Sequence, residues 1–427
     1  MSDERADRIR YLAALGRAFL IGALSGLFAV VFLAVEHALT GLVWGHDLPI
    51  EVFSGGWKAA AVPVVAGLVV GVLYIVLKLP ARLSGFIEEL EAGRVEPATA
   101  PGAVAVALVS LIGGASLGPE APLATGAGGA ATWWAERRGA SAGVVRAHNE
   151  VAVSGVFGGL LTSPLIGGLL TIELEHQRSP EHTLRNIVPA IVAGVAGFLV
   201  VNPLLGEPFL GRYAFEPFEL AYWHFAAAVV AGIVGACVAV AMGVVTRLVR
   251  SLTQPLDRRP ALRGLVGGLV LGGLGFAFPL SMFSGVDQLE AAFENAAAIG
   301  AGVLIVTAVV KMITLAVSLN TGFYGGPFFP TFFIGGTVGV AVNLLFPEFP
   351  LALAVGSFMG ATAGAVASIP LSIIIFAIYV VGLGPPAAGV VGVATVTGFV
   401  IIHLLGFAGS AGKGAAPDAP EPAVPNG

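Results

Sequence analysis

The sequence is poor in charge and in cysteine. Only 11% of its 427 residues are charged, and the whole chain holds one cysteine, Cys237. Soluble domains carry about 25% charged residues, so this chain has too few to cover a surface that faces water. One thiol excludes an intramolecular disulfide and a thiolate metal cluster. We therefore expect lipid to be the main solvent, with no metal, no other cofactor and no nucleic-acid partner.

Long apolar runs are what the sequence has in excess. Hydrophobic residues make up 56% of it, and the mean hydropathy is +0.91. A helix needs about 20 apolar residues to cross the hydrocarbon core. Runs of that length lie near residues 12–44, 57–78, 148–175, 186–204, 218–245, 260–280, 297–319 and 387–407. The 60 glycines and 27 prolines fall largely within this region, which is typical of closely packed or broken membrane helices. The fold class we predict is an all-α polytopic membrane protein.

The charges that remain indicate an orientation in the membrane. The run 218–245 is followed by clustered arginines and preceded by glutamates: Arg247, Arg250, Arg258, Arg259 and Arg263 against Glu207, Glu216 and Glu219. Positive loops stay in the cytoplasm, and the N-terminus carries Arg5, Arg8, Arg10 and Arg17. We expect a multi-pass protein of the cell membrane with a cytoplasmic N-terminal segment 1–11, a transmembrane domain 12–407 and a disordered tail 408–427.

An internal repeat divides the transmembrane domain. Gly118-Pro119-Glu120-Ala121-Pro122 and Gly326-Pro327-Phe328-Phe329-Pro330 end on prolines 208 residues apart. Ser163-Pro164-Leu165 and Ile369-Pro370-Leu371 are 206 apart, and Ser84-Gly85 and Ser284-Gly285 are 200 apart. These landmarks predict two related halves, about 12–204 and 218–407, with a substrate site between them near the midplane. Broken helices obscure the number of crossings, which decides between parallel and inverted halves; our expectation is inverted halves.

Three segments have the form of a helix start at membrane depth. They are Ser84-Gly85-Phe86-Ile87, Gly118–Pro122 and Gly326–Pro330. The first N–H groups of a helix have no partner within it and carry partial positive charge, so several such ends aimed at one point can hold an anion. The alternative is that these segments are only helix starts and kinks. The anion-binding residues we predict are Ser84, Gly85, Gly118, Gly326, Phe328 and Phe329.

Glu120 is an ionisable residue between apolar stretches. Such a residue is costly in a membrane and is a functional candidate by default. At a helix N-terminus its carboxylate would use the same N–H groups that hold an anion, and an anion or a proton would release it. We therefore predict a gating role for Glu120, with a simple N-terminal capping carboxylate as the alternative.

These residues resemble the CLC family of chloride channels and transporters. Gly118–Pro122 is similar to the family motif Gly-Arg/Lys-Glu-Gly-Pro, Gly326–Pro330 fits Gly-x-Phe-x-Pro, and Leu83–Ile87 resembles a degraded Gly-Ser-Gly-Ile-Pro. The resemblance implies a CLC-like fold with broken and tilted helices, and a homodimer with one pore per subunit. It also implies that Ser84 gives its hydroxyl to a central anion, that Glu120 is the external gating glutamate, and that the backbone around Phe328 supplies donors.

The chain also departs from the family pattern. Pro327 lacks an N–H, Pro119 replaces a basic residue, and Phe86-Ile87 replaces Ile-Pro. Where the family places a tyrosine hydroxyl against the anion, our register gives Gly384. Tyr379 is either a weak substitute or a packing or interfacial residue. We expect a central site that is more open or weaker than in the family.

A second glutamate would be needed for proton coupling. The resemblance places it in Ile172-Glu173-Leu174-Glu175, where Glu173 or Glu175 could relay protons, or both could be helix-end carboxylates. The function we predict is transport of chloride or a similar small anion, channel-like or weakly proton-coupled. The alternatives are a chloride/proton antiporter that uses Glu173 or Glu175, and a transporter selective for fluoride or another small anion.

Other classes of function find little support in the sequence. An intramembrane enzyme needs a nucleophile and a base that converge, yet the only thiol is Cys237 and no His-Glu-x-x-His pattern occurs. A cation transporter needs several membrane carboxylates on one path, and the chain offers chiefly Glu120. We expect no enzymatic activity. Lys311, inside an apolar run, is expected either to reach an interface with its ammonium or to attract anions to a vestibule.

Overall fold

The regular structure of the chain is helical. The computed structural model describes residues 2–45, 55–85, 88–89, 92–174, 180–206, 209, 211–367 and 369–406, and within these ranges there is no strand, only one isolated backbone bridge. The predicted all-α fold is confirmed. The predicted tail 408–427 and the candidate relay Glu175 lie outside the described residues.

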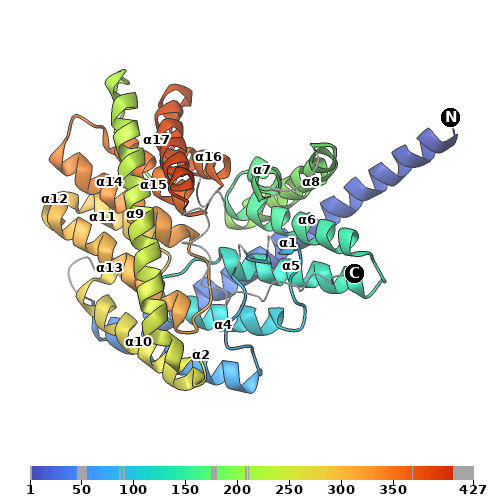
Figure 1. The fold of residues 1–427 in the computed structure, drawn as a ribbon, viewed down its shortest axis with the longest axis horizontal. Helices are drawn as coiled ribbons and strands as arrows, with labels where there is room; N and C mark the ends of the chain where they lie inside the picture. The colour runs from blue at the N-terminus through green and yellow to red at the C-terminus, as the bar shows by residue number, and fades with distance from the viewer. Residues whose placement is uncertain are drawn as a thin grey trace, which may run out of the picture.

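The described part of the chain forms sixteen α-helices, which Figure 1 shows as two groups side by side. In the first half the helices are α1 (Ser2–Trp44), α2 (Trp57–Val76), α4 (Ala100–Ile112), α5 (Glu120–Glu136), α6 (Ala142–Leu160), α7 (Pro164–Leu174) and α8 (Pro180–Leu205). In the second half they are α9 (Trp223–Thr253), α10 (Pro260–Ala277), α11 (Val286–Glu294), α12 (Ala296–Ile299), α13 (Ala301–Asn320), α14 (Phe328–Leu345), α15 (Leu351–Ala367), α16 (Pro370–Val381) and α17 (Pro385–Leu404).

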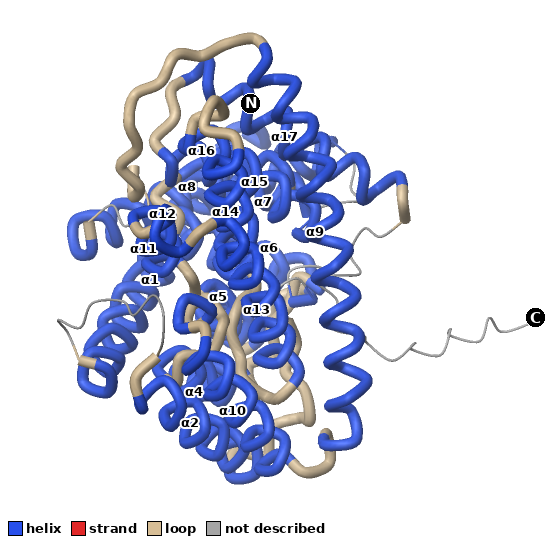
Figure 2. The backbone as a smooth tube through the Cα atoms, turned by 90° about the vertical axis from the view of Figure 1, so that its left-hand side faces the viewer, coloured by secondary structure: helices blue, strands red, loops and turns tan. Residues whose placement is uncertain are grey.

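The two halves repeat one packing pattern. Helices α2 and α4–α8 correspond in order to α10 and α13–α17, which follow about 200 residues later. Helix α1 packs on α6 and α8, just as α9 packs on α15 and α17. The halves also contact each other: α2 and α10 lie together at one end of the molecule, beside α4 (Figure 2). The predicted duplication is therefore confirmed in the fold.

Two predicted boundaries differ from the observed helices. The run 148–175 is not one span, because α6 ends at Leu160 and α7 begins at Pro164. Thr162 between them has a φ of 51°, a backbone conformation that interrupts a right-handed helix. The predicted border between a segment 1–11 and the membrane domain falls inside α1, which is continuous from Ser2.

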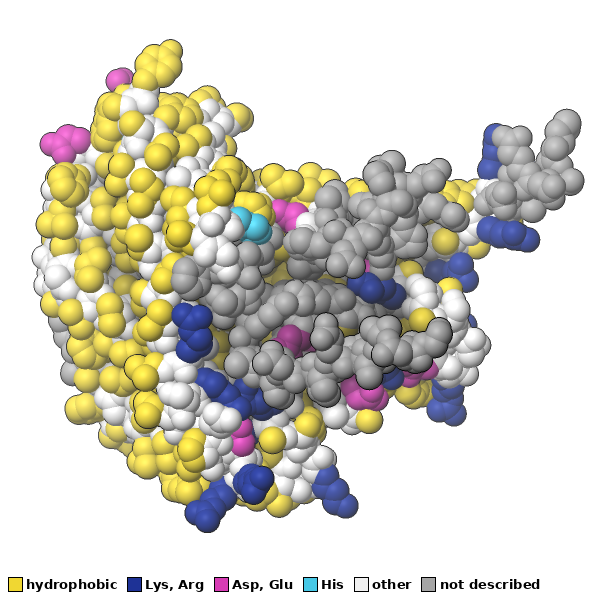
Figure 3. Space-filling model, in the orientation of Figure 1, with side chains coloured by type: hydrophobic (Ala, Val, Ile, Leu, Met, Phe, Trp, Pro, Cys, Tyr) yellow, Lys and Arg dark blue, Asp and Glu magenta, His cyan; other side chains and the backbone are white. Residues whose placement is uncertain are grey.

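The outer surface of the helix bundle is apolar. In the part of the chain that the structure describes, eight helices are long and apolar enough to cross a membrane: α1, α2, α8, α9, α10, α13, α14 and α17. Large apolar side chains stand exposed on them, including Leu42 at 77% and Leu404 at 81%, and hydrophobic side chains cover most of the left-hand face in Figure 3. Such a surface is stable in lipid and not in water. The chain is a multi-pass membrane protein.

Small residues allow the two halves to approach closely. A Cβ atom on Gly67 of α2 would lie 2.1 Å from the carbonyl oxygen of Gly264 on α10, and one on Gly264 would lie 2.0 Å from that of Gly67. The backbones of α2 and α10 are therefore in direct contact, as in other membrane helix pairs built on glycine.

Two neighbouring glycines of α10 differ in the free space around them. A Cβ on Gly272 would lie 2.3 Å from the carbonyl oxygen of Ala60, whereas one on Gly273 would meet no atom within 4 Å. We expect Gly272→Leu to destabilise the protein by about 1–3 kcal/mol or more through overpacking, and Gly273→Leu to leave it unchanged. Thermal unfolding of both variants in detergent measures the difference. Equal midpoints for the two would contradict the packing described.

Candidate functional site

The two glycine-proline motifs meet at the centre of the fold. The Gly118 N–H donates to the Gly326 carbonyl at 2.8 Å, and the Gly326 N–H donates to the Gly118 carbonyl at 2.8 Å. This pairing is antiparallel, and α5 and α14 begin two residues after it, at Glu120 and Phe328. The two helix starts therefore meet at one point, where the two chain segments run in opposite directions.

The carboxylate of Glu120 lies on the N-terminus of α14. Glu120 is 0% exposed, its Oε1 accepts the Phe328 N–H at 2.7 Å, and the Phe329 N–H also donates to the carboxylate. Pro327 and Pro330 have no N–H, so Phe328 and Phe329 are the donors that this helix start offers. A negative charge at this point is stabilised by unpaired N–H groups and by the helix dipole.

Two glycines make room for this carboxylate. A Cβ on Gly118 would lie 2.0 Å from Glu120 Oε2, and a Cβ on Gly326 would lie 2.1 Å from Glu120 Oε1. Any other residue at either position would overlap with the side chain of Glu120. We call Gly118, Gly326, Phe328 and Phe329 the cradle of Glu120. Its Oε2 has no hydrogen-bond partner among the described residues, which leaves room for one more donor.

Ser84 lies beside the chain segment that leads into the cradle. Its carbonyl is 3.2 Å from the hydroxyl of Tyr324, which precedes Gly326 by two residues. Ser84 is exposed and lines a cavity of about 230 Å³ together with Glu88 and Glu89. We call this space the Ser84 cavity. The Gly85 N–H, predicted as an anion donor, donates to the Glu88 carboxylate at 3.1 Å.

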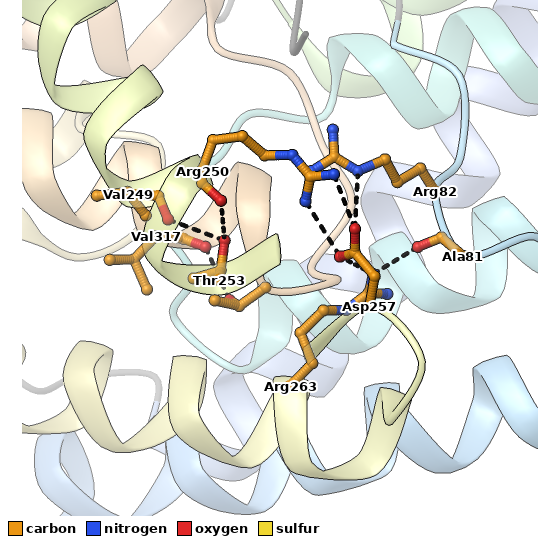
Figure 4. A network of polar contacts seen from close by, with 9 residues as sticks. Ala81, Arg82, Val249, Arg250, Thr253, Asp257, Arg263 and Val317 are labelled. Carbon is orange, nitrogen blue, oxygen red and sulfur yellow. Dashed lines mark hydrogen bonds and ion pairs between the residues drawn. The ribbon is translucent and has the colours of Figure 1, made fainter. Parts of the chain in front are cut away.

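A cluster of arginines holds the chain segment that precedes Ser84. Asp257, in the connection between α9 and α10, accepts bonds from Arg250 at 2.7 and 3.1 Å and from Arg263 at 3.3 Å (Figure 4). Arg82 is 3.8 Å from the same carboxylate, and Arg263 also donates to the Ala81 carbonyl. The backbone that carries Ser84 is thus tied to the second half, in a cluster with more positive than negative charge.

Aromatic rings close the opposite side of the cradle. Phe328 and Phe329 pack against Phe376, and Phe329 stacks on Phe209 with ring centroids 5.0 Å apart. The cavity among these rings measures about 10 Å³, about the least that a water molecule needs. These rings therefore leave little free space on their side of the cradle.

Glu173, the candidate proton relay, caps another helix. Its carboxylate accepts the backbone N–H groups of Leu371 and Ser372 and, at 2.6 Å, the Ser372 hydroxyl. These donors are at the start of α16, so Glu173 of the first half neutralises a helix N-terminus of the second half. This geometry fits a helix-end carboxylate. The helix end that Glu173 contacts is that of α16 in the second half, not that of its own helix α7. A relay role for Glu173, as for Glu175, stays a prediction.

One of the two expectations for Lys311, and the register that gave Gly384, are wrong. Lys311 does not reach an interface: it is 0% exposed, and its Nζ donates to the carbonyls of Met282 and Phe283 at 2.7 Å each. Gly384 does not line the cradle, because it lies in an exposed turn before α17 with no atom within 4 Å of its Cβ position. Tyr379 is half-buried near the end of α16, and its carbonyl accepts the Gly211 N–H.

Sequence reasoning missed several polar residues near the site. Thr125 and Tyr324 form a buried pair of hydroxyls beside Ser84 and Glu89. The signal was available for Tyr324, which stands directly before the Gly325-Gly326 pair. Gly114–Gly118 also fits the Gly-x-Ser-x-Gly pattern of hydrolases. Its Ser116 is fully buried in a loop, and the described residues give it neither the strand nor the histidine partner that such a nucleophile needs. No cluster of three metal-ligating side chains occurs in the described ranges.

The chain is similar to known proteins along most of its length. Residues 66–399 match a family model described as voltage gated chloride channel. Among curated relatives, YfeO of Escherichia coli and YfeO of Escherichia fergusonii, for which ion transport is proposed, are 27% identical over 356 residues. These alignments cover 79% of this chain and 81% of each relative.

Solved structures share the fold. A slow cyanobacterial Cl⁻/H⁺ antiporter superimposes with a TM-score of 0.78 at 19% identity, covering 93% of this chain and 96% of the antiporter. A CLC-type fluoride/proton antiporter superimposes with a TM-score of 0.73 at 18% identity, covering 91% and 95%. These likenesses support the two-half architecture described above.

The fit of Glu120 in its cradle predicts an energetic coupling. Gly326→Ala places a methyl group on the Glu120 carboxylate, so we expect it to cost about 1–3 kcal/mol of stability. In a Glu120→Ala background the space is free, and we expect the same substitution to cost at least about 1 kcal/mol less. The free energies of unfolding in detergent of the wild type, the two single variants and the double variant give this difference. Gly392→Ala on α17, which meets no atom within 4 Å, should be additive with Glu120→Ala. Additivity for Gly326→Ala too would contradict the cradle.

Proposed function

The chain belongs to the voltage gated chloride channel family, the CLC family of anion transporters, and we propose that Glu120 gates its anion path. The observation that carries this proposal is the hydrogen bond from the Phe328 N–H to the Glu120 carboxylate at 2.7 Å. A helix N-terminus that binds a carboxylate this way has the chemistry to bind chloride. Glu120 therefore holds the place of the transported anion.

Competition for the same donors makes this contact a gate. While the carboxylate is ionised, it satisfies the N–H groups of Phe328 and Phe329 and excludes an anion. Protonation removes its charge and weakens a charge-assisted bond worth roughly 1.5–3 kcal/mol. An anion that arrives at sufficient concentration displaces the carboxylate by mass action. Either event opens the cradle.

The Ser84 cavity is the approach that we propose for the anion. The support is its volume of about 230 Å³ beside Ser84, whereas the aromatic rings around Phe329 leave only about 10 Å³. The surplus of arginine around Asp257 raises the local concentration of anions, and Ser84 would contribute its hydroxyl. By the positive-inside rule this arginine-rich end faces the cytoplasm, with the N-terminus, in a cell membrane. We further propose a homodimer with one such path in each subunit.

Transport is channel-like or weakly proton-coupled in this proposal. The support is the state of Glu173, whose carboxylate is committed to three donors at the start of α16. These bonds hold the carboxylate in place at the helix start, which suits a cap better than a group that must move to pass protons on. The second candidate function is chloride/proton exchange, in which Glu173 or Glu175 relays protons. Selectivity for fluoride is a third.

Replacing the gate should remove its response to pH. In wild-type protein we expect anion efflux from liposomes to rise as the pH falls, because protonated Glu120 releases the cradle. Glu120→Gln cannot ionise, so at a chloride concentration that saturates the anion site we expect efflux at pH 7.5 to be about as fast as in acid and pH-dependent gating to be lost. A chloride electrode after addition of valinomycin measures the efflux.

Glu136 provides the control for this substitution. It lies at the other end of α5, exposed and paired with Arg94 at 2.8 Å, so Glu136→Gln should keep the wild-type pH response. A Glu120→Gln protein that is as pH-sensitive as wild type would show that the gate is elsewhere.

Proton movement distinguishes the two modes of transport. We expect a pH electrode, read during chloride efflux, to show little or no proton uptake with wild-type protein. Uptake in a fixed ratio to chloride, lost in Glu173→Gln, would instead establish the exchange mechanism.

A further inference from the structure

A row of oxygen atoms links Glu89 to Ser84. The Thr125 hydroxyl lies 2.6 Å from Glu89 Oε2 and 2.7 Å from the Tyr324 hydroxyl, which lies 3.2 Å from the Ser84 carbonyl. Thr125 is 1% and Tyr324 is 6% exposed. The Tyr324 backbone is held by its N–H, which donates to Ser110 Oγ at 3.0 Å. The row thus joins a carboxyl group in the Ser84 cavity to the backbone of the residue beside the cradle.

The number of hydrogens in this row depends on the charge of Glu89. Each hydroxyl supplies one hydrogen, and there are three contacts to fill. When Glu89 is ionised, Thr125 donates to it and Tyr324 donates to Thr125, which leaves the Ser84 carbonyl without a donor. When Glu89 is protonated, it donates to Thr125, Thr125 donates to Tyr324, and Tyr324 donates to Ser84. All three contacts are hydrogen bonds only in the protonated state.

The surroundings of Glu89 leave it free to change charge. Described charged residues that line the same cavity are Glu88, Arg94 and Glu96. Glu88 accepts the Gly85 N–H, and Arg94 is bound to Glu96 at 2.7 Å and to Glu136 at 2.8 Å. Glu89 forms no ion pair with any residue that the structure describes.

The pKa of Glu89 supports a charge change near neutral pH. Glu89 belongs to the connection between α2 and α4, outside the eight apolar spans. Burial raises its pKa to about 7; the Thr125 hydroxyl opposes this shift, and Glu88 adds to it. Glu89 is therefore mostly protonated below neutral pH and mostly ionised above it.

We propose that Glu89 is a proton-binding residue of the anion path and that its protonation strengthens anion binding beside Ser84. The proposal rests on the proposed function, because it assumes that an anion binds between Ser84 and the cradle. Protonation removes a negative charge from the cavity through which the anion arrives. It also turns the Tyr324 hydroxyl onto the Ser84 carbonyl, which otherwise presents an unpaired negative dipole near the anion.

Coupling of this kind is reciprocal. If a proton on Glu89 strengthens anion binding, a bound anion must strengthen proton binding by the same factor. Anion binding near pH 7 therefore takes up protons, even in a protein whose gate no longer titrates.

Calorimetric titration of chloride into Glu120→Gln protein in detergent tests the proposal. In this background Glu120 does not titrate. We expect chloride to bind about fivefold more weakly at pH 8 than at pH 6, the scale of one unit charge acting through partly hydrated protein. The added substitution Glu89→Gln should remove the pH dependence and give the pH 6 affinity at both values, because the amide is neutral and still donates to Thr125.

Matched variants separate this effect from a general loss of charge. Glu96→Gln removes a carboxylate from the same cavity, but one that is paired with Arg94, and should keep the fivefold difference. Tyr324→Phe keeps the charge and loses the hydroxyl, so the difference should shrink without vanishing. If the chloride affinity still depends on pH after Glu89→Gln, the proposed role of Glu89 is wrong, and the proposed anion site is unaffected. Absence of chloride binding in Glu120→Gln itself overturns the proposed anion site instead.

Infrared spectroscopy tests the protonation of Glu89 without a substitution of Glu89 itself. In the Glu120→Gln protein a protonated carboxyl band should appear as the pH falls through 7. Thr125→Val should shift the frequency of this band, because it removes the hydroxyl that contacts Glu89. A spectrum with no carboxyl titrating near neutral pH contradicts the proposal.

Discussion

The hydrogen bond between the Glu120 carboxylate and the Phe328 N–H is the contact on which the site depends. Its two partners come from different halves of the chain, 208 residues apart. They meet because the Gly118 and Gly326 backbones pair antiparallel, so that α5 and α14 start at one point. The same glycines leave the volume that the carboxylate occupies. Duplication of the fold thus brings two helix starts together, and one acidic side chain lies at their meeting point, where we propose that it gates the anion path.

A second carboxylate shows what sets Glu120 apart. Glu173 also comes from the first half and also binds a helix start of the second, that of α16. It has three donors and lies beside the exposed Leu371, so its contact is satisfied and needs no exchange. Glu120 is fully buried, has an oxygen with no donor among the described residues, and adjoins a segment that borders a cavity. The same helix-end chemistry therefore serves as a cap at α16 and, in the function we propose, as a gate at α14.

Features that follow from short motifs in the sequence were predicted, and most other contacts between distant residues were not. Apolar runs and the spacing of Gly and Pro indicated the helices, the repeat and the meeting of Glu120 with Phe328, because each depends on a short motif. The break at Thr162 depends on one φ angle, and the burial of Lys311 depends on carbonyls 28 and 29 residues away. The register that placed Gly384 in the site relied on counting along the last helices. The link from Glu89 through Thr125 to Tyr324 joins residues 36 and 199 apart, which no local pattern reveals.

The account claims that an anion and the Glu120 carboxylate occupy the same place. Anomalous diffraction from crystals of Glu120→Gln protein grown in bromide tests this directly, because bromide replaces chloride and its position is seen without assumptions. The account predicts a bromide peak within hydrogen-bond distance of the Phe328 N–H, where the carboxylate lies in the wild-type protein, and no peak there in wild type at high pH. A cradle empty of bromide in the variant, with bromide bound elsewhere or nowhere, would contradict it.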